Sequence, residues 1–160
     1  MNWRILLLPL LAWMVHAGPA HAGGPAPWGS ATEIEQAYSG QKVVFDTTSG
    51  TTAGLSSVLD RASLISALNG ADPLSNKIVI VLHGHAIPFF AIKNYGKYKD
   101  LMHRAQSLSV GGVVEYRMCR AAARLQGFQA KDIHGFVKMV PMADAEIARL
   151  QQEEGFAYLQ

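Results

Sequence analysis

Short runs of β-branched and aliphatic residues alternate with stretches of helical periodicity from residue 42 to the end of the chain. Residues 77–83 (KIVIVLH) are almost continuously apolar, which is typical of a strand buried on both faces of a sheet. Residues 55–69 instead place apolar side chains at i, i+3 and i+4, which predicts a helix with one buried face. Similar patterns predict further strands at residues 42–46, 111–118, 136–140 and 156–160, and further helices at residues 98–108, 120–126 and 143–154.

The order of these elements predicts the class of fold. Strands that alternate with helices favour an α/β domain with a mostly parallel five-stranded sheet, covered by helices on both faces. In such sheets functional groups gather at the carboxyl ends of the strands. The loops at residues 47–54 and 84–90, and the strand end at Cys119 and Arg120, are therefore expected to lie at one edge of the sheet.

The start of the chain has the features of a secretory signal peptide. Arg4 supplies a positive start, an apolar run follows, and the sequence AHA before Gly23 gives a small-x-small cleavage pattern. The apolar run is shorter than the roughly 20 residues of a spanning helix, so we expect no stable membrane insertion after cleavage; an uncleaved anchor is the alternative. We predict a signal peptide at residues 1–22, a flexible leader at 23–41 and one domain at 42–160, in the periplasm or secreted.

The net charge and the single cysteine limit the partners and the chemistry to be expected of this chain. The formal net charge is +2 with neutral histidines, and no basic run stands out, so nucleic acid is not expected as a partner. Cys119 is the only cysteine and cannot form an internal disulfide. In an oxidising compartment this thiol stays free, reacts, or pairs with another molecule.

Cys119 lies at a predicted join between a strand and a helix, and Arg117 and Arg120 lie within two residues of it. A helix N-terminus and nearby arginines both favour a thiolate over a thiol. Because strand side chains alternate between faces, Glu115, Arg117 and Cys119 should share one face of the sheet. The alternatives are a buried, inert thiol and a Glu115–Arg117 ion pair that leaves the sulfur alone.

Arg124 follows Cys119 at the spacing that a rhodanese-type loop uses for a basic residue. The phosphatase-loop spacing fails, because it requires an arginine where this chain has Leu125. The alanines at 121–123 favour a helix over a cradle of free N–H groups. The spacing of Arg124 therefore does not by itself establish an anion-binding loop, and a solvated arginine is the alternative.

Two histidines, His83 and His85, close the second predicted strand, and neighbouring strands could bring them near Cys119. Imidazole titrates near neutral pH, so either ring could move protons or bind a metal; we predict no bound metal, and a Cys/His site for a soft metal is the alternative. Residues 49–54 lack the dinucleotide fingerprint and the P-loop lysine, so no nucleotide cofactor is expected. Asp46 could act as an acid or a base, but the sequence assigns it no partner.

Four blocks of the chain resemble the DsrE/DsrF-like family, in particular its exported single-domain members. They are KVVFDTTSG, KIVIVLHGHAIPFF, VVEYRMCRAAARLQGF around Cys119, and GFVKMVPMADAEIARLQQEEGFAYLQ. The Cys119 block also looks like the persulfide-carrying strand-to-helix turn of related sulfur-relay proteins. The resemblance implies a flavodoxin-like three-layer fold, homo-oligomers such as trimers or hexamers, and reversible loading of sulfane sulfur on Cys119.

We therefore expect a periplasmic persulfide carrier, or a slow sulfurtransferase, that works between donor and acceptor proteins or small sulfur species. Cys119 would carry the sulfur, Arg117 and Arg120 would stabilise its anion, and His83 or His85 would move the proton. The alternatives are a non-catalytic homo-oligomeric binding module in which Cys119 only packs, and a protein that binds a metal through Cys119 and a histidine. Residues 87–92 (IPFFAI) form either an oligomer interface or part of the domain interior.

Overall fold

The computed structural model describes residues 26–68 and 70–160. The predicted signal peptide at residues 1–22 lies outside them. Residues 26–36 belong to one unit and are exposed, without a regular helix or strand. A second, compact unit spans Ala37–Gln160 and is described below. None of the helices in the described residues combines the length and apolarity that crossing a membrane requires.

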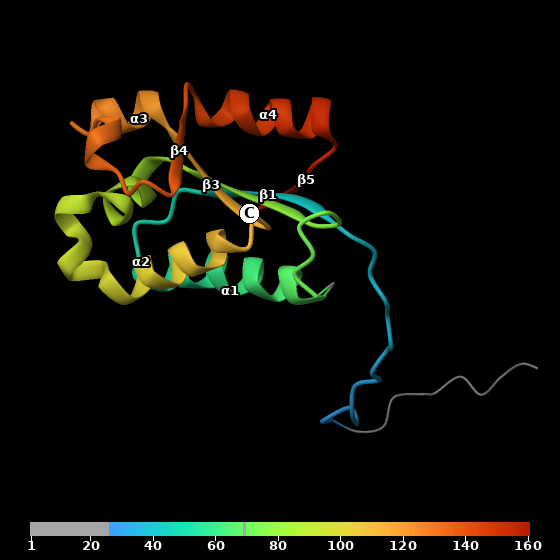
Figure 1. Ribbon diagram of the computed structural model, residues 1–160. Coiled ribbons are helices and arrows are strands. Elements are labelled where there is room, and N and C mark those ends of the chain that lie inside the picture. Colours follow the sequence, from blue (N-terminus) through green and yellow to red (C-terminus); the bar gives the residue numbers. More distant parts are fainter. Residues whose placement is uncertain (1–25, 69) are drawn as a thin grey trace, which may run out of the picture. The chain divides into compact units, whose positions relative to one another are not determined.

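Five parallel strands form one sheet in the order β4-β3-β2-β1-β5 (Figure 1). The strands are β1 (Lys42–Thr47), β2 (Lys77–Leu82), β3 (Val114–Cys119), β4 (Val137–Val140) and β5 (Ala157–Leu159). The α-helices are α1 (Thr52–Leu68), α2 (Tyr95–Val110), α3 (Arg120–Leu125) and α4 (Ala143–Glu154). The predicted three-layer α/β fold of the flavodoxin-like kind is confirmed, and the sheet is parallel throughout.

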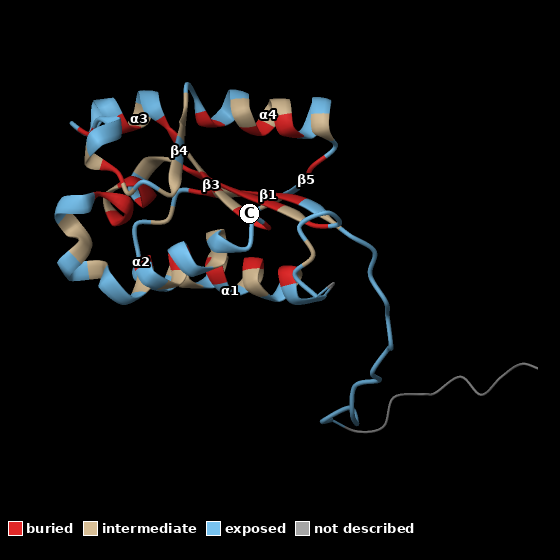
Figure 2. Ribbon diagram, viewed as in Figure 1, coloured by how far each residue is buried: buried red, intermediate tan, exposed pale blue. Residues whose placement is uncertain are grey.

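Helices cover both faces of the sheet. α1 and α2 lie on one face and α4 lies on the other (Figure 1). Residues 78–82 of β2 are fully buried, as their continuous apolar pattern predicts (Figure 2). The larger apolar cluster joins α1 and α2 to the sheet, and the smaller one packs Ile147 and Leu150 of α4 against Val79 and Val81 of β2. Cys119 belongs to the smaller cluster.

The apolar stretch after β2 packs inside the domain. It forms a 3₁₀ segment at Gly84–Phe90 and is not an exposed loop. Ile87 and Phe90 are fully buried, and the Phe90 ring centroid lies 5.5 Å from that of Tyr116 in β3. Of the two alternatives for residues 87–92, the oligomer interface is therefore wrong for this stretch. Ile92 is the exception, because half of its surface remains exposed.

Among the predicted element boundaries that shift, two have a local reason. α2 begins at Tyr95, before the predicted start at Tyr98, and Tyr98 itself leaves helical geometry with φ −120° and ψ 24°. This kink interrupts the periodicity, so the first turn is not visible in the pattern. β3 begins at Val114 because Gly112, with φ 75°, turns the chain just before it.

Candidate functional site

Cys119 is the last residue of β3 and caps the N-terminus of α3. Its backbone is extended, with φ −63° and ψ 109°, and its Sγ accepts a hydrogen bond from the Ala122 backbone N–H at 3.4 Å. The first N–H groups of a helix have no partner within the helix, so a side-chain acceptor satisfies one of them. The predicted position of Cys119 at a strand-to-helix join is confirmed.

The sulfur is almost covered. Cys119 is 5% exposed and packs in the apolar cluster that contains Ala143 and Ile147 of α4. A reagent can reach Sγ only if it is small or if the surrounding segments open locally. The sequence pattern places Cys119 correctly but does not predict this burial, because α4 provides it from a later part of the chain.

Glu115, Arg117 and Cys119 share the α4 face of the sheet, as the alternation along β3 predicts. Arg117 Nε donates to Glu115 Oε1 at 2.6 Å, and Arg117 also donates to Glu146 on α4. Lys138 on β4 donates to the other oxygen of Glu115 at 2.6 Å. Arg117 is therefore an ion-paired residue that links β3 to α4, and the Glu115–Arg117 alternative is confirmed.

These ion pairs change the pKa values of Glu115, Glu146 and Arg117. Burial alone would raise the pKa of Glu115, but hydrogen bonds from Lys138 and Arg117 outweigh it, so the pKa lies below its usual range. A hydrogen bond from Arg149 lowers the pKa of Glu146 against the effect of burial, and Arg117 lowers it further. Burial opposes the charge on Arg117, but its hydrogen bonds to Glu115 and Glu146 raise its pKa. Glu115, Glu146 and Arg117 therefore stay charged across the neutral range.

A second polar group joins the ends of β1, β2 and β5. His83 Nε2 lies 2.5 Å from Asp46 Oδ1, and the Tyr158 hydroxyl donates to Asp46 Oδ2 at 2.8 Å. An ionised carboxylate can only accept, so His83 Nε2 carries the hydrogen in this pair. The hydrogen bond that Tyr158 donates to Asp46 raises the pKa of the Tyr158 hydroxyl. Asp46, which the sequence leaves without a partner, thus has two.

The strand register places this group on the same face as Cys119. Leu82 pairs with Met118 between β2 and β3, so the next residues, His83 and Cys119, lie at the same level of adjacent strands. Leu82 and Met118 pack in the larger cluster, whereas Cys119 and Val81 pack in the smaller one. Alternation then puts His83 on the Cys119 face. The structure therefore brings a thiol, an imidazole and a carboxylate to adjacent strand ends.

His85 lies elsewhere at the same edge. Gly84, with φ 54°, turns the chain after His83, and His85 is exposed. A Cβ on Gly50 would lie 2.9 Å from His85 Cβ, so the His85 loop packs closely on the loop between β1 and α1. Gln126 Nε2 donates to the Gly84 carbonyl at 2.7 Å, which ties the same loop to the end of α3.

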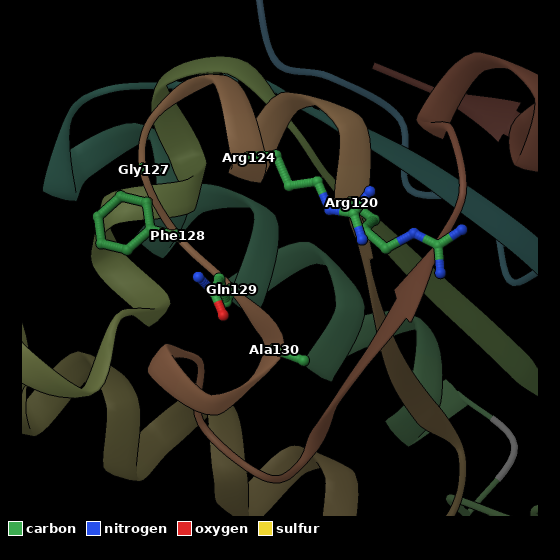
Figure 3. Close-up of a pocket in the computed structure, with 6 residues that line it drawn as sticks. All are labelled: Arg120, Arg124, Gly127, Phe128, Gln129 and Ala130. Carbon is green, nitrogen blue, oxygen red and sulfur yellow. The ribbon is translucent and has the colours of Figure 1, made fainter.

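Arg120 and Arg124 line a hollow beside α3. Both are exposed, and the hollow has a volume of about 670 Å³. Its other lining residues are Gly127, Phe128, Gln129 and Ala130, which follow the helix (Figure 3). The predicted helix at this position is confirmed, so Arg124 meets the hollow from a helix and not from a rhodanese-type loop.

Two further places bear on binding, the histidines near Cys119 and the loop at residues 49–54. Among the described residues, His, Cys, Asp and Glu side chains form no group of three or more that could hold a metal ion. In the loop before α1, the Gly54 N–H bonds Thr51 Oγ1 at 3.1 Å and the Thr51 N–H bonds Ser49 Oγ at 3.3 Å. Side chains of the loop therefore occupy donors that a bound anion would need.

Sequence reasoning missed Tyr158 and Glu146. Tyr158 pairs with Val44 in the β1–β5 register, and its side chain reaches Asp46 from there. Glu146 lies on α4 and meets Arg117 across the smaller cluster. Both contacts depend on strand order and helix placement, which no local pattern encodes.

Comparison with known proteins supports the fold and leaves the function open. No family profile matches the chain, and no curated protein matches its sequence. A solved structure of a protein of unknown function, MTH1491 from Methanobacterium thermoautotrophicum, has a TM-score of 0.56 and 21% sequence identity. The match covers 74% of this chain and 97% of that one. At this identity the likeness extends to the three-layer fold alone.

Proposed function

We propose that this protein is a sulfur carrier that holds sulfane sulfur as a persulfide on Cys119, in the manner of the DsrE/DsrF-like proteins that its sequence resembles. The observation that carries the proposal is the position of Cys119 at a strand-to-helix join, with Sγ facing the Ala122 N–H. An N–H donor favours the anionic form of the sulfur. The same donor would favour the anion of a bound persulfide.

The loading step is a displacement at sulfur. The Cys119 thiolate attacks the outer sulfur of a donor persulfide R–S–SH, a new S–S bond forms, and the old S–S bond breaks. The thiolate R–S⁻ leaves with the electron pair, and Cys119 becomes Cys–S–SH. Transfer to an acceptor thiolate repeats the displacement in reverse. No net oxidant or reductant is needed, so the protein requires only a sulfur donor and an acceptor, which are proteins or small sulfur species.

His83 is the residue we assign to proton transfer. Asp46 holds His83 Nε2 as a donor at 2.5 Å, so in the neutral ring Nδ1 remains as the acceptor. A base oriented by a carboxylate and placed on the face of a nucleophile is the arrangement that activates weakly ionised thiols. His85 is the second candidate, because it lies exposed on the loop that follows.

The two arginines that flank Cys119 in the sequence, Arg117 and Arg120, have different roles in this proposal. Arg120 is exposed and directly follows Cys119, so it can approach an incoming donor. Arg117 has two carboxylate partners, so its role is to hold β3 and α4 together around the thiol and to offset the charge of those partners.

The proposal also includes the compartment in which the protein works and its oligomeric state. Cleavage of residues 1–22 would release the domain into the periplasm or the medium, where a lone thiol needs protection from oxidation. Burial of Cys119 at 5% exposure supports such protection. A homo-oligomer, a trimer or hexamer as in the family that the sequence resembles, would be the working form.

Intact mass spectrometry of the protein after incubation with polysulfide tests the proposal. The wild-type chain should gain one sulfur, about 32 Da, and lose it on treatment with a thiol. Cys119→Ser should gain none, and it keeps a hydroxyl that can cap α3. A wild-type protein that gains no sulfur even after long incubation would rule out the carrier function.

The burial of Cys119 also favours a second candidate, a non-catalytic binding module in which the thiol only packs. Cys119 contacts the apolar cluster of α4, as a structural cysteine would. In that case native Cys119 should react with iodoacetamide only at the rate of local unfolding, and Cys119→Ser should leave every partner interaction intact. Fast alkylation of the native protein together with sulfur loading would exclude it.

A further inference from the structure

The hollow beside α3 is lined by cationic, amide and apolar groups. Arg120 and Arg124 supply its charge, and Phe128 and Gln129 form part of its wall (Figure 3). No carboxylate lies among its lining residues. Its volume of about 670 Å³ suits a small molecule.

The two arginines differ from the other arginines on this side of the molecule. Arg117 and Arg149 both pair with carboxylates. Arg120 and Arg124 have no ion pair with a carboxylate within residues 26–68 and 70–160. They stand one turn apart on α3, where like charges repel, and Arg120 also opposes the helix dipole. An anion in the hollow would offset both costs.

The surroundings of the hollow are also cationic. A neighbouring hollow of about 330 Å³ shares Gly127 and Phe128 with it and adds Lys93 and Lys131. Lys93 Nζ lies 4.7 Å from the centroid of the Phe128 ring. Asp132 is the acid in this second hollow, and its Oδ2 already accepts the Gln129 N–H at 2.8 Å. The residues that line the two hollows therefore carry a net positive charge, which would attract an anionic ligand.

One residue that lines the hollow is the neighbour of Cys119 in the chain, although Cys119 itself is not among the lining residues. Arg120 directly follows Cys119, and Gln126 joins the end of α3 to the carbonyl of Gly84, the residue after His83. A ligand held by Arg120 and Arg124 would thus lie beside the segment that carries Cys119. Planar guanidinium groups bind oxyanions through paired N–H donors, which sets the class of ligand.

We infer that this hollow binds the oxyanion group of a small anionic sulfur donor and holds it for reaction with Cys119; the identity of the ligand as a sulfur donor rests on the proposed function. Thiosulfate is the simplest member of this class. The Cys119 thiolate attacks its outer sulfur, the S–S bond of thiosulfate breaks, and sulfite leaves with the electron pair. Cys119 then carries Cys–S–S⁻, and the total charge is unchanged.

Binding is measured first, without sulfur transfer. Thiosulfate is titrated by calorimetry into the full chain carrying Cys119→Ser, and into the same chain with Arg124→Gln or Arg120→Gln added. Each arginine substitution should weaken binding about tenfold or more, since it removes a charged hydrogen bond. Lys99→Gln is the matched control, because it removes one exposed charge on α2, outside the hollow, and should leave the affinity unchanged. Equal affinity in all four proteins, or no binding by any of them, would overturn the site.

Sulfur loading of Cys119 then separates the site from the function. Thiosulfate has an oxyanion group, whereas polysulfide has none, so Arg124→Gln should slow loading from subsaturating thiosulfate about tenfold and leave loading from polysulfide nearly unchanged. If thiosulfate binds through the arginines but only polysulfide loads Cys119, the donor assignment is wrong. If neither donor loads Cys119 while arginine-dependent binding persists, the carrier function fails and the anion site stands.

Discussion

At the scale of the residue, Cys119 combines an N–H donor at its sulfur with nearly complete burial. Its position could be predicted, because a strand pattern ends and a helix pattern begins around it. Its surroundings could not, because they include Ile147 of α4 and Val81 of β2, which come from other parts of the chain. Asp46 illustrates the same limit, since its partners are His83, which follows β2, and Tyr158 of β5.

The pair formed by Asp46 and His83 carries the first prediction. His83→Gln and Asp46→Asn should each slow loading of Cys119 from polysulfide at neutral pH by about ten- to a hundredfold, because proton transfer loses its oriented base. The measurement is the initial rate of mass gain after addition of polysulfide to each variant and to the wild-type protein.

Tyr158→Phe is the matched control for this pair. It removes one hydrogen bond to Asp46 and keeps the ring, so loading should change by only a few-fold. His85→Gln tests the other histidine. Unchanged loading in His83→Gln, combined with slow loading in His85→Gln, would move the proton-transfer role to His85.

At the scale of the element, the ion pairs of Arg117 join β3 to α4 over the thiol. Arg117→Met should lower the free energy of unfolding by about 1–3 kcal/mol, because a largely buried pair is lost while Glu115 and Glu146 keep Lys138 and Arg149. Urea unfolding at pH 7 measures this change. Arg104→Met is the control, because its partner Asp60 is exposed, and it should cost less than about 1 kcal/mol.

The pH dependence of stability follows from the lowered pKa values of Glu115 and Glu146. A carboxylate whose pKa is lowered by folding stabilises the folded state above its usual pKa, and this contribution is lost as pH falls through the lowered value. Wild-type stability should therefore decline on acidification below about pH 5. Glu146→Gln should be less stable at pH 7 and should decline less steeply. If the free energy of unfolding falls equally steeply with decreasing pH in both proteins, Glu146 does not contribute to this pH dependence.

The 3₁₀ segment Gly84–Phe90 carries a prediction about packing. Phe90→Ala should destabilise the domain by about 3–5 kcal/mol, because Phe90 is fully buried beside Tyr116 and Phe136. Ile92→Ser changes a half-exposed side chain of the same stretch and should cost about 0.5 kcal/mol or less. Thermal unfolding compares the two. Similar small effects would mean that the stretch does not pack as part of the core.

Most elements could be predicted from the sequence because their patterns are strong and local. The continuous apolar run of β2 and the one-sided pattern of α1 are such cases. Residues 87–92 are ambiguous in the sequence, because a run of apolar residues with a proline fits both an interface and an interior turn. The choice depends on the space between α2 and β3, which Phe90 fills.

At the scale of the whole molecule, the likeness to MTH1491 extends to the fold alone, so the oligomeric state must be tested directly. We predict that the chain from Gly23 sediments as a trimer or hexamer at micromolar concentration. Its melting temperature should then rise with protein concentration, since dissociation accompanies unfolding. Sedimentation velocity of only a roughly 15 kDa species, with a melting temperature independent of concentration, would show a monomer.

The near-complete burial of Cys119 has a consequence for the difference between the empty and the loaded protein. A persulfide places its terminal sulfur about 2 Å beyond Sγ. Loading would therefore place the reactive atom beyond a residue that is itself only 5% exposed. The thiol of the empty carrier would be shielded from other thiols and from oxidants, whereas the terminal sulfur of the loaded carrier would lie farther out. An acceptor that contacts this terminal sulfur would then bind the loaded carrier in preference to the empty one.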